Sequence, residues 1–151
     1  MLTTMGLQVA VIGSGAEWEE LAEEVGRLLG ACGCTVITGG LGEVMAAAQR
    51  GAKAAGGTTV AILPGEDRRA ANPWSDHVVV TGIGHARNLA VAASGDAVIA
   101  VGGSYGTVAE MGLALRLGRR VVALEGAPVV DGALRAASAE DAVGLALRDL
   151  R

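Results

Sequence analysis

The chain has 151 residues, so one domain with a sizeable core is expected. Its formal net charge is −4 and its 12 basic residues are scattered, which excludes the continuous basic stripe that a nucleic-acid polymer requires. Apolar residues make up 51% of the sequence but aromatic residues only 2%, so the core has to be built from aliphatic side chains.

No segment has the features of a leader or of a membrane span. Met1–Gln8 contains no basic residue, and the apolar run that follows is broken at Gly13. Uncharged apolar runs stay well below the ~18 residues of a spanning helix. We therefore predict a cytoplasmic protein without a membrane partner. The C-x-C pair of Cys32 and Cys34 is too small a set for zinc, and no metal site is predicted.

Short apolar runs alternate with helical patterns along the chain. Strands are predicted at 8–13, 35–38, 58–63, 77–81, 97–101 and 120–124. Helices are predicted at about 18–32, 43–55, 85–93 and 107–117, with a last helix that begins at a capping box formed by Ser138 and Asp141. The polar segment 65–76 is predicted to be a loop.

Strands that are apolar throughout and alternate with helices have to be covered on both faces. The sequence therefore predicts one α/β domain over residues 1–151, a three-layer Rossmann-like fold in which helices flank a mostly parallel sheet. In such sheets, ligands bind at the carboxyl ends of the strands, where the strand order reverses. The glycine-rich turns of this chain all fall at that edge.

The first glycine turn is Gly13-Ser14-Gly15. It lacks the third glycine of a dinucleotide fingerprint, because Trp18 stands at that position, and the strand 35–38 carries no acid for a ribose. NAD is therefore disfavoured as a ligand. A capping box between Ser14 and Glu17 is an equally good interpretation of this turn.

Two later turns are richer in glycine, and both open a predicted helix. Backbone N–H groups at a helix start attract anions, and glycine lets a phosphate approach them closely. Across the three turns, the candidate phosphate- or ligand-binding residues are Gly13, Ser14, Gly15, Gly39, Gly40, Gly42, Gly102, Gly103, Ser104, Tyr105, Gly106 and Thr107. Glu110 follows the last turn as a candidate catalytic carboxylate. Its alternative role is a capping box with Thr107.

These motifs, with 57–65 and Arg87-Asn88 between them, resemble the LOG-type phosphoribohydrolase superfamily, long labelled lysine decarboxylase-like. The likeness extends from the first strand to about Leu124 and is strongest to the short branch that includes molybdenum cofactor carrier proteins. It implies that Glu110 and Arg87 are catalytic and that Asn88 belongs to the ligand site. Three departures are Val101 in place of a proline, two residues instead of one before Gly106, and Asn88 in place of a lysine.

The leading functional hypothesis is hydrolysis of the N-glycosidic bond of nucleoside 5′-monophosphates. An ionised carboxylate stabilises an oxocarbenium-like state and orients water, and Arg87 could hold Glu110 ionised. The alternatives are a non-catalytic carrier or sensor for a nucleotide or a molybdopterin-type cofactor, and an orphan scaffold. No cofactor is required for hydrolysis.

Lysine decarboxylation is rejected, because that chemistry needs a Schiff-base lysine and Lys53, the single lysine, lies near the end of a helix. His77 and His85 are predicted to be structural or to face solvent.

The large apolar fraction predicts a homo-oligomer, a dimer or a tetramer. The helices at 45–55 and 108–117 carry small residues that allow close approach. LOG-like proteins pair through such helices and share residues between sites, so the resemblance implies the same assembly. The expected partners are a small phosphorylated ligand and further copies of the chain.

Overall fold

A computed structural model describes residues 6–150, which contain one seven-stranded sheet in the order β4-β3-β2-β1-β5-β6-β7, with every neighbouring pair parallel. The predicted absence of a leader concerns Met1–Gln8, of which the first five residues lie outside the described part. The strands are β1 (Gln8–Ser14), β2 (Thr35–Thr38), β3 (Thr58–Leu63), β4 (His77–Val80), β5 (Ala97–Gly102), β6 (Arg120–Ala123) and β7 (Leu134–Arg135).

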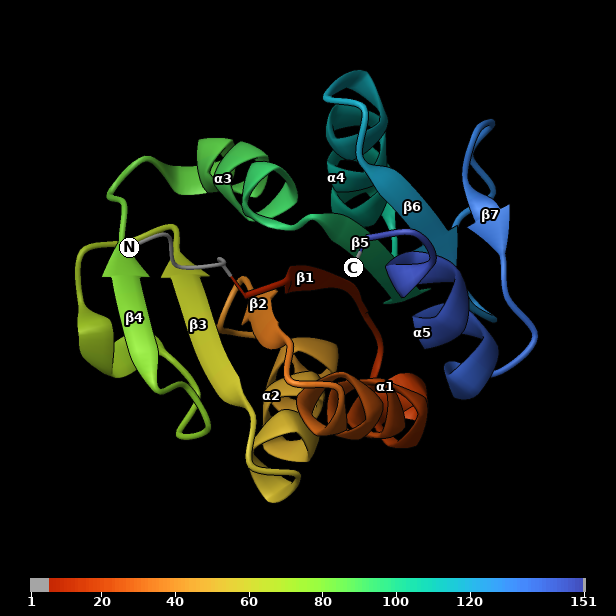
Figure 1. Cartoon of the computed structure of the whole chain (residues 1–151). Helices are drawn as coiled ribbons and strands as arrows, with labels where there is room; N and C mark the ends of the chain where they lie inside the picture. Colours follow the sequence, from red (N-terminus) through yellow and green to blue (C-terminus); the bar gives the residue numbers. More distant parts are fainter. Residues whose placement is uncertain (1–5, 151) are drawn as a thin grey trace, which may run out of the picture.

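Helices cover both faces of the sheet. α1 (Glu19–Ala31), α2 (Glu43–Ala54) and α5 (Ala139–Leu147) lie on one side, and α3 (Arg87–Ser94) and α4 (Tyr105–Arg116) on the other (Figure 1). Short 3₁₀ turns precede α1 and α3, at Ala16–Trp18 and Gly84–Ala86, and a third occupies Arg68–Ala70 within the predicted loop. The predicted three-layer Rossmann-like fold is confirmed.

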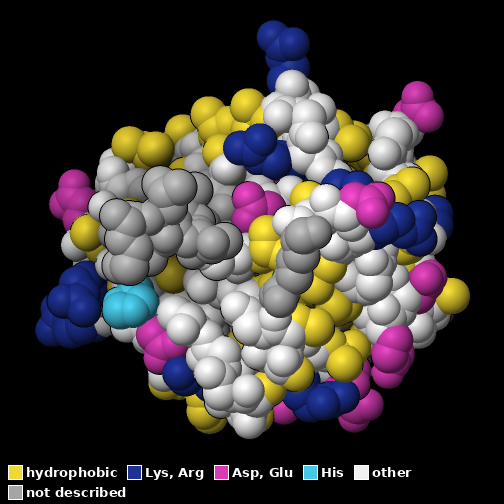
Figure 2. Space-filling model, viewed as in Figure 1, with side chains coloured by type: hydrophobic (Ala, Val, Ile, Leu, Met, Phe, Trp, Pro, Cys, Tyr) yellow, Lys and Arg dark blue, Asp and Glu magenta, His cyan; other side chains and the backbone are white. Residues whose placement is uncertain are grey.

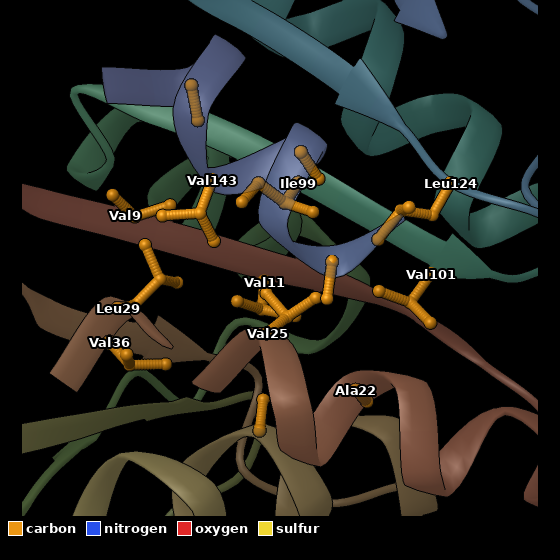
Figure 3. Packing of buried hydrophobic residues seen from close by; sticks show 14 of the residues in the cluster. Val9, Val11, Ala22, Val25, Leu29, Val36, Ile99, Val101, Leu124 and Val143 are labelled. Carbon is orange, nitrogen blue, oxygen red and sulfur yellow. The ribbon is translucent and has the colours of Figure 1, made fainter. Parts of the chain in front are cut away.

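Alternating residues of the strands pack into two separate hydrophobic cores, one on each face of the sheet. Val9 and Val11 of β1 face α1, α2 and α5, where they pack with Val25, Leu29 and other aliphatic side chains (Figure 3). Ala10 of β1 faces the other side and packs beneath α3 and α4. A β-strand that is buried on both faces must be apolar at every position, which is why the predicted strands had no polar alternation.

α1 and α2 cross at very short range. A Cβ atom at Gly26 would lie 1.8 Å from the carbonyl oxygen of Ala48, and one at Gly51 would lie 2.0 Å from that of Glu23. These distances are below any real contact, so the two glycines allow the helix backbones to touch. The buried small residues of α2, namely Ala47, Ala48, Gly51 and Ala52, are thus packed within the chain.

Two further details of the fold differ from the predictions or refine them. β7 was not predicted, because two exposed residues at a sheet edge leave no periodic pattern. Lys53 lies at the amino edge of the sheet. Its Nζ atom is 2.9 Å from the carboxylate of Asp76, which accepts a hydrogen bond from the N–H of Thr59 near the start of β3.

Within residues 6–150, no helix is both long and apolar enough to cross a membrane.

Candidate functional site

The strand order reverses between β1 and β5, the two central strands. The chain leaves β1 toward α1 on one face and leaves β5 toward α4 on the other, so the two connections diverge and open a crevice at the carboxyl edge. A pocket of about 200 Å³ occupies this crevice, and it is lined by Gly13, Ser14, Met45, His85, Arg87, Asn88, Ser104, Gly106, Thr107 and Glu110.

The floor of the pocket depends on close contact between β1 and β5. Gly13 pairs with Val101 in the register of these strands, and a Cβ atom there would lie 1.8 Å from the Val101 carbonyl oxygen. Gly13 also has a φ of +128°, a backbone conformation that favours glycine. The first glycine turn is therefore required by the packing of the site as well as being available to a ligand.

α4 begins at the third glycine turn, and its capping differs from the prediction. Ser104 precedes the helix, and its N–H donates to the hydroxyl of Thr107 at 3.3 Å. The predicted capping box of Thr107 with Glu110 is wrong, because the helix starts at Tyr105 and Glu110 lies in its second turn. The capping box of Ser14 with Glu17 is also wrong, since no side chain caps the turn after Gly15.

Arg87 is the first residue of α3, and its side chain runs beneath the second glycine turn. A Cβ atom at Gly39 would lie 1.8 Å from Nη1 of Arg87, so an alanine at 39 would displace the guanidinium. Arg87 is only 7% exposed, and its Nε and Nη1 atoms have no hydrogen-bond partner in the described part of the chain. A buried, unsatisfied cation of this kind is costly unless a ligand pairs with it.

Glu110 faces the same pocket from α4 and is 4% exposed. Its Oε2 atom has no hydrogen-bond partner among the described residues. Burial raises its pKa to about 7, and the positive charge of Arg87 offsets only part of that rise. Arg87 thus favours the ionised form of Glu110, as expected, but the desolvation of the carboxyl group has the larger effect. The structure gives a carboxyl group that changes protonation near neutral pH.

The sequence-predicted residues separate into two groups. Eight line the pocket, namely Gly13, Ser14, Arg87, Asn88, Ser104, Gly106, Thr107 and Glu110. The others do not line it, namely Gly15, Gly39, Gly40, Gly42, Gly102, Gly103 and Tyr105. Gly40 packs against β3, where its Cβ would lie 2.7 Å from that of Ala61.

Sequence reasoning missed two residues that line the pocket. Met45 lies in the first turn of α2 and His85 in the 3₁₀ turn before α3. His85 is exposed, as predicted, yet it also contributes to the pocket wall. Its position two residues before Arg87 was the available signal.

Comparisons with known proteins identify the family and support the fold. The model of the SLOG cluster4 family matches residues 6–146. The chain belongs to the SLOG cluster4 family. An uncharacterised protein of Archaeoglobus fulgidus is 43% identical over 140 residues, which are 91% of this chain and 92% of that protein.

Solved structures extend the relationship. The molybdenum cofactor binding protein of Rippkaea orientalis is 29% identical, with a TM-score of 0.86 over 95% of this chain and 96% of that chain. The molybdenum cofactor carrier protein of Chlamydomonas reinhardtii is 31% identical, with a TM-score of 0.84 over 93% of this chain and 95% of that chain. The resemblance stated from the motifs is thus confirmed.

The pKa of Glu110 predicts how stability depends on pH. Its ordinary value is 4.5 and its folded value is about 7, so the folded state retains a proton that the unfolded state releases. Stability should therefore fall as pH rises between these values, by up to about 1.4 kcal/mol per pH unit. Glu110→Gln keeps the shape without titrating. Urea unfolding between pH 5 and 8 should show the wild type losing stability relative to this variant, and parallel profiles would contradict the assignment.

Proposed function

We propose that this chain binds a phosphorylated, pterin- or nucleotide-like ligand in the pocket at the carboxyl edge and acts as a carrier for a molybdopterin-type cofactor. The observation that carries the proposal is the buried guanidinium of Arg87, whose Nε and Nη1 atoms lack partners beside a pocket. An anionic ligand would supply the missing acceptors. Two structural relatives that cover nearly the whole chain are molybdenum cofactor proteins, which supports this class of ligand.

The residues of the pocket fit an organic phosphate. The first N–H groups of α4 have no partner within the helix, and they lie beside Gly106, which leaves the backbone open. Arg87 offers planar donors that suit a phosphate. In a molybdenum cofactor the pterin's own dithiolene sulfurs hold the metal, which supplies redox chemistry elsewhere. This chain would therefore need to hold only the organic anion.

The size of the pocket limits how much of the ligand it encloses. Its volume of about 200 Å³ is smaller than the roughly 300–1,000 Å³ of pockets that surround a whole small molecule. A phosphate and its neighbouring group would fit inside. The remainder of the ligand would lie at the rim, which suits a protein that has to hand its ligand on.

A second candidate is hydrolysis of the N-glycosidic bond of a nucleoside monophosphate. The specific observation in its favour is Glu110, a buried carboxyl group with a pKa of about 7 on the wall of the pocket. A group that titrates near the working pH can take up and release a proton in each cycle. The residues Val101 and Tyr105, which depart from the catalytic motif, place this candidate second.

The third glycine turn, residues 102–106, is called the phosphate cradle below, and its proposed role can be tested at Gly106. No atom lies within 4 Å of a Cβ built there, so Gly106→Ala should leave the melting temperature unchanged or slightly raised. The new methyl group would enter the pocket and keep an anion from the backbone. Calorimetry with GMP, whose guanine shares the 2-amino-4-oxopyrimidine ring of pterin, should show at least about tenfold weaker binding, a loss of about 1.4 kcal/mol.

Gly112→Ala provides the matched control. It lies on the same helix, also has open space around a Cβ, and does not line the pocket. It should raise stability slightly, because alanine favours a helix interior over glycine, and it should leave GMP affinity unchanged. Equal affinities for wild type, G106A and G112A would reject the pocket as the binding site.

The carrier and the hydrolase differ in the fate of the ligand. Protein purified from cells that make molybdenum cofactor should release a pterin on denaturation, detected as its fluorescent oxidised form by chromatography. The same preparation should leave AMP and GMP intact over hours. Release of free base and ribose 5-phosphate, abolished by Glu110→Gln at an unchanged melting temperature, would reverse the order of the two candidates.

We also propose that the chain forms a homo-oligomer through α3 and α4. Leu89 on α3 is 47% exposed and Val108 on α4 is 40% exposed, and Figure 2 shows hydrophobic side chains along the edge of the molecule that lies over α3. α3 and α4 contact each other, so Leu89 and Val108 belong to adjoining parts of the surface. Covering apolar side chains of this size favours association.

Light scattering should give at least twice the chain mass of 15.0 kDa at micromolar concentration. A double substitution, Leu89→Glu with Val108→Glu, should lower the mass to that of a monomer, because it places four charges in each pair of facing surfaces. A wild-type monomer under the same conditions would refute the assembly.

A further inference from the structure

Tyr105 is the one tyrosine of a chain that contains two Trp and no Phe. Its side chain is 92% exposed, the largest exposed fraction among the large apolar residues of the described part. It is the first residue of α4 and stands between Ser104 and Gly106, both of which line the pocket. A ring that is almost wholly in solvent, on a residue between two that line the pocket, favours a function in binding.

The position of Tyr105 also coincides with the place where the cradle is longer than the catalytic motif. Two residues, Ser104 and Tyr105, separate Gly103 from Gly106, where the resemblance implies one. Ser104 has a structural use, because its N–H donates to Thr107 and starts the helix. Tyr105 has no such use, since its side chain makes no hydrogen bond within the described residues and is almost wholly in solvent.

We propose that Tyr105 is the stacking surface for the flat heteroaromatic ring of a ligand whose phosphate lies in the pocket. The inference rests on the proposed function and deepens it, since it names the part of the ligand that the pocket does not enclose. Arg87 lines the pocket, and its unpartnered Nε and Nη1 atoms would attract the phosphate end of the ligand. The ring then lies at the rim, where an aromatic side chain offers a π face.

Stacking on an aromatic side chain suits a pterin and a purine alike, because every such ring has a π face. It contributes to affinity without reading the hydrogen-bonding edge of the ring. Tyr105 therefore determines that the ligand carries a flat ring, while the choice between pterin and purine is made by other contacts.

The test compares a ligand with the ring and one without it. Calorimetry is performed with GMP and with ribose 5-phosphate, on the wild type, Tyr105→Ala, Tyr105→Phe and Trp74→Ala. Trp74 is the matched control, because it is also exposed and aromatic but lies outside the pocket. Tyr105→Ala should weaken GMP about tenfold and leave ribose 5-phosphate within about twofold. Tyr105→Phe and W74A should bind both ligands as the wild type does.

Each other outcome overturns the inference in a distinct way. Unchanged GMP affinity in Y105A shows that the ring does not stack there. Equal losses for both ligands show that Tyr105 shapes the phosphate cradle instead. A lower mass of Y105A in light scattering, with unchanged GMP affinity, assigns the side chain to a subunit interface. If the wild type binds ribose 5-phosphate as tightly as GMP, the phosphate site stands and the stacking surface fails, whereas binding of neither ligand refutes the proposed function as well.

Discussion

The burial of Arg87 beneath the second glycine turn is the constraint on which the site depends. A guanidinium can occupy this space only because residue 39 has no Cβ, which would lie 1.8 Å from Nη1. The cation is held at the start of α3, next to the point where the order of the central strands reverses. The rest of the fold serves this placement, since β1 and β5 bring α4 and Glu110 to the same pocket. A buried cation without a partner destabilises a hydrophobic core, whereas a bound anion would offset that cost.

The two buried charged groups also act on each other through the pocket. Glu110 loses hydration on burial, which raises its pKa to about 7 despite the nearby cation. Burial lowers the pKa of Arg87 from its ordinary value, while Glu110 opposes that shift. An incoming phosphate would add negative charge next to Arg87 and so favour the protonated form of Glu110. Binding of such an anion would therefore be coupled to uptake of a proton, and the neutral carboxyl group would then be a hydrogen-bond donor toward the ligand.

The sequence predicted six of the seven strands, because each of the six contains an apolar run with a glycine or proline within three residues of its end. Tertiary contacts were harder to predict. Nothing local indicates that Gly39 makes room for Arg87, which is 48 residues away in the chain. The start of α4 was misplaced because Thr107 and Glu110 have the spacing of a capping box, whereas Ser104 three residues earlier satisfies the helix start. Met45 and His85 enter the pocket through the packing of α2 and α3, which no sequence pattern specifies.

A carrier and a hydrolase could share this pocket. The feature that distinguishes the two functions is the number of residues between Gly103 and Gly106, which is two in this chain and one in the catalytic motif. Glu110 projects from the second turn of α4, so its position is fixed by the helix and by packing against the sheet. The extra residue before Gly106, Ser104 or Tyr105, stands at the start of the helix and changes the path of the backbone that would contact a phosphate. Affinity tolerates such a change, because the donors still converge on an anion. Catalysis does not, since displacing a reacting group by about 1 Å can cost a hundredfold in rate. On this argument, a chain that retains Arg87 and Glu110 but has a longer turn before Gly106 would keep the proposed binding and lose bond cleavage.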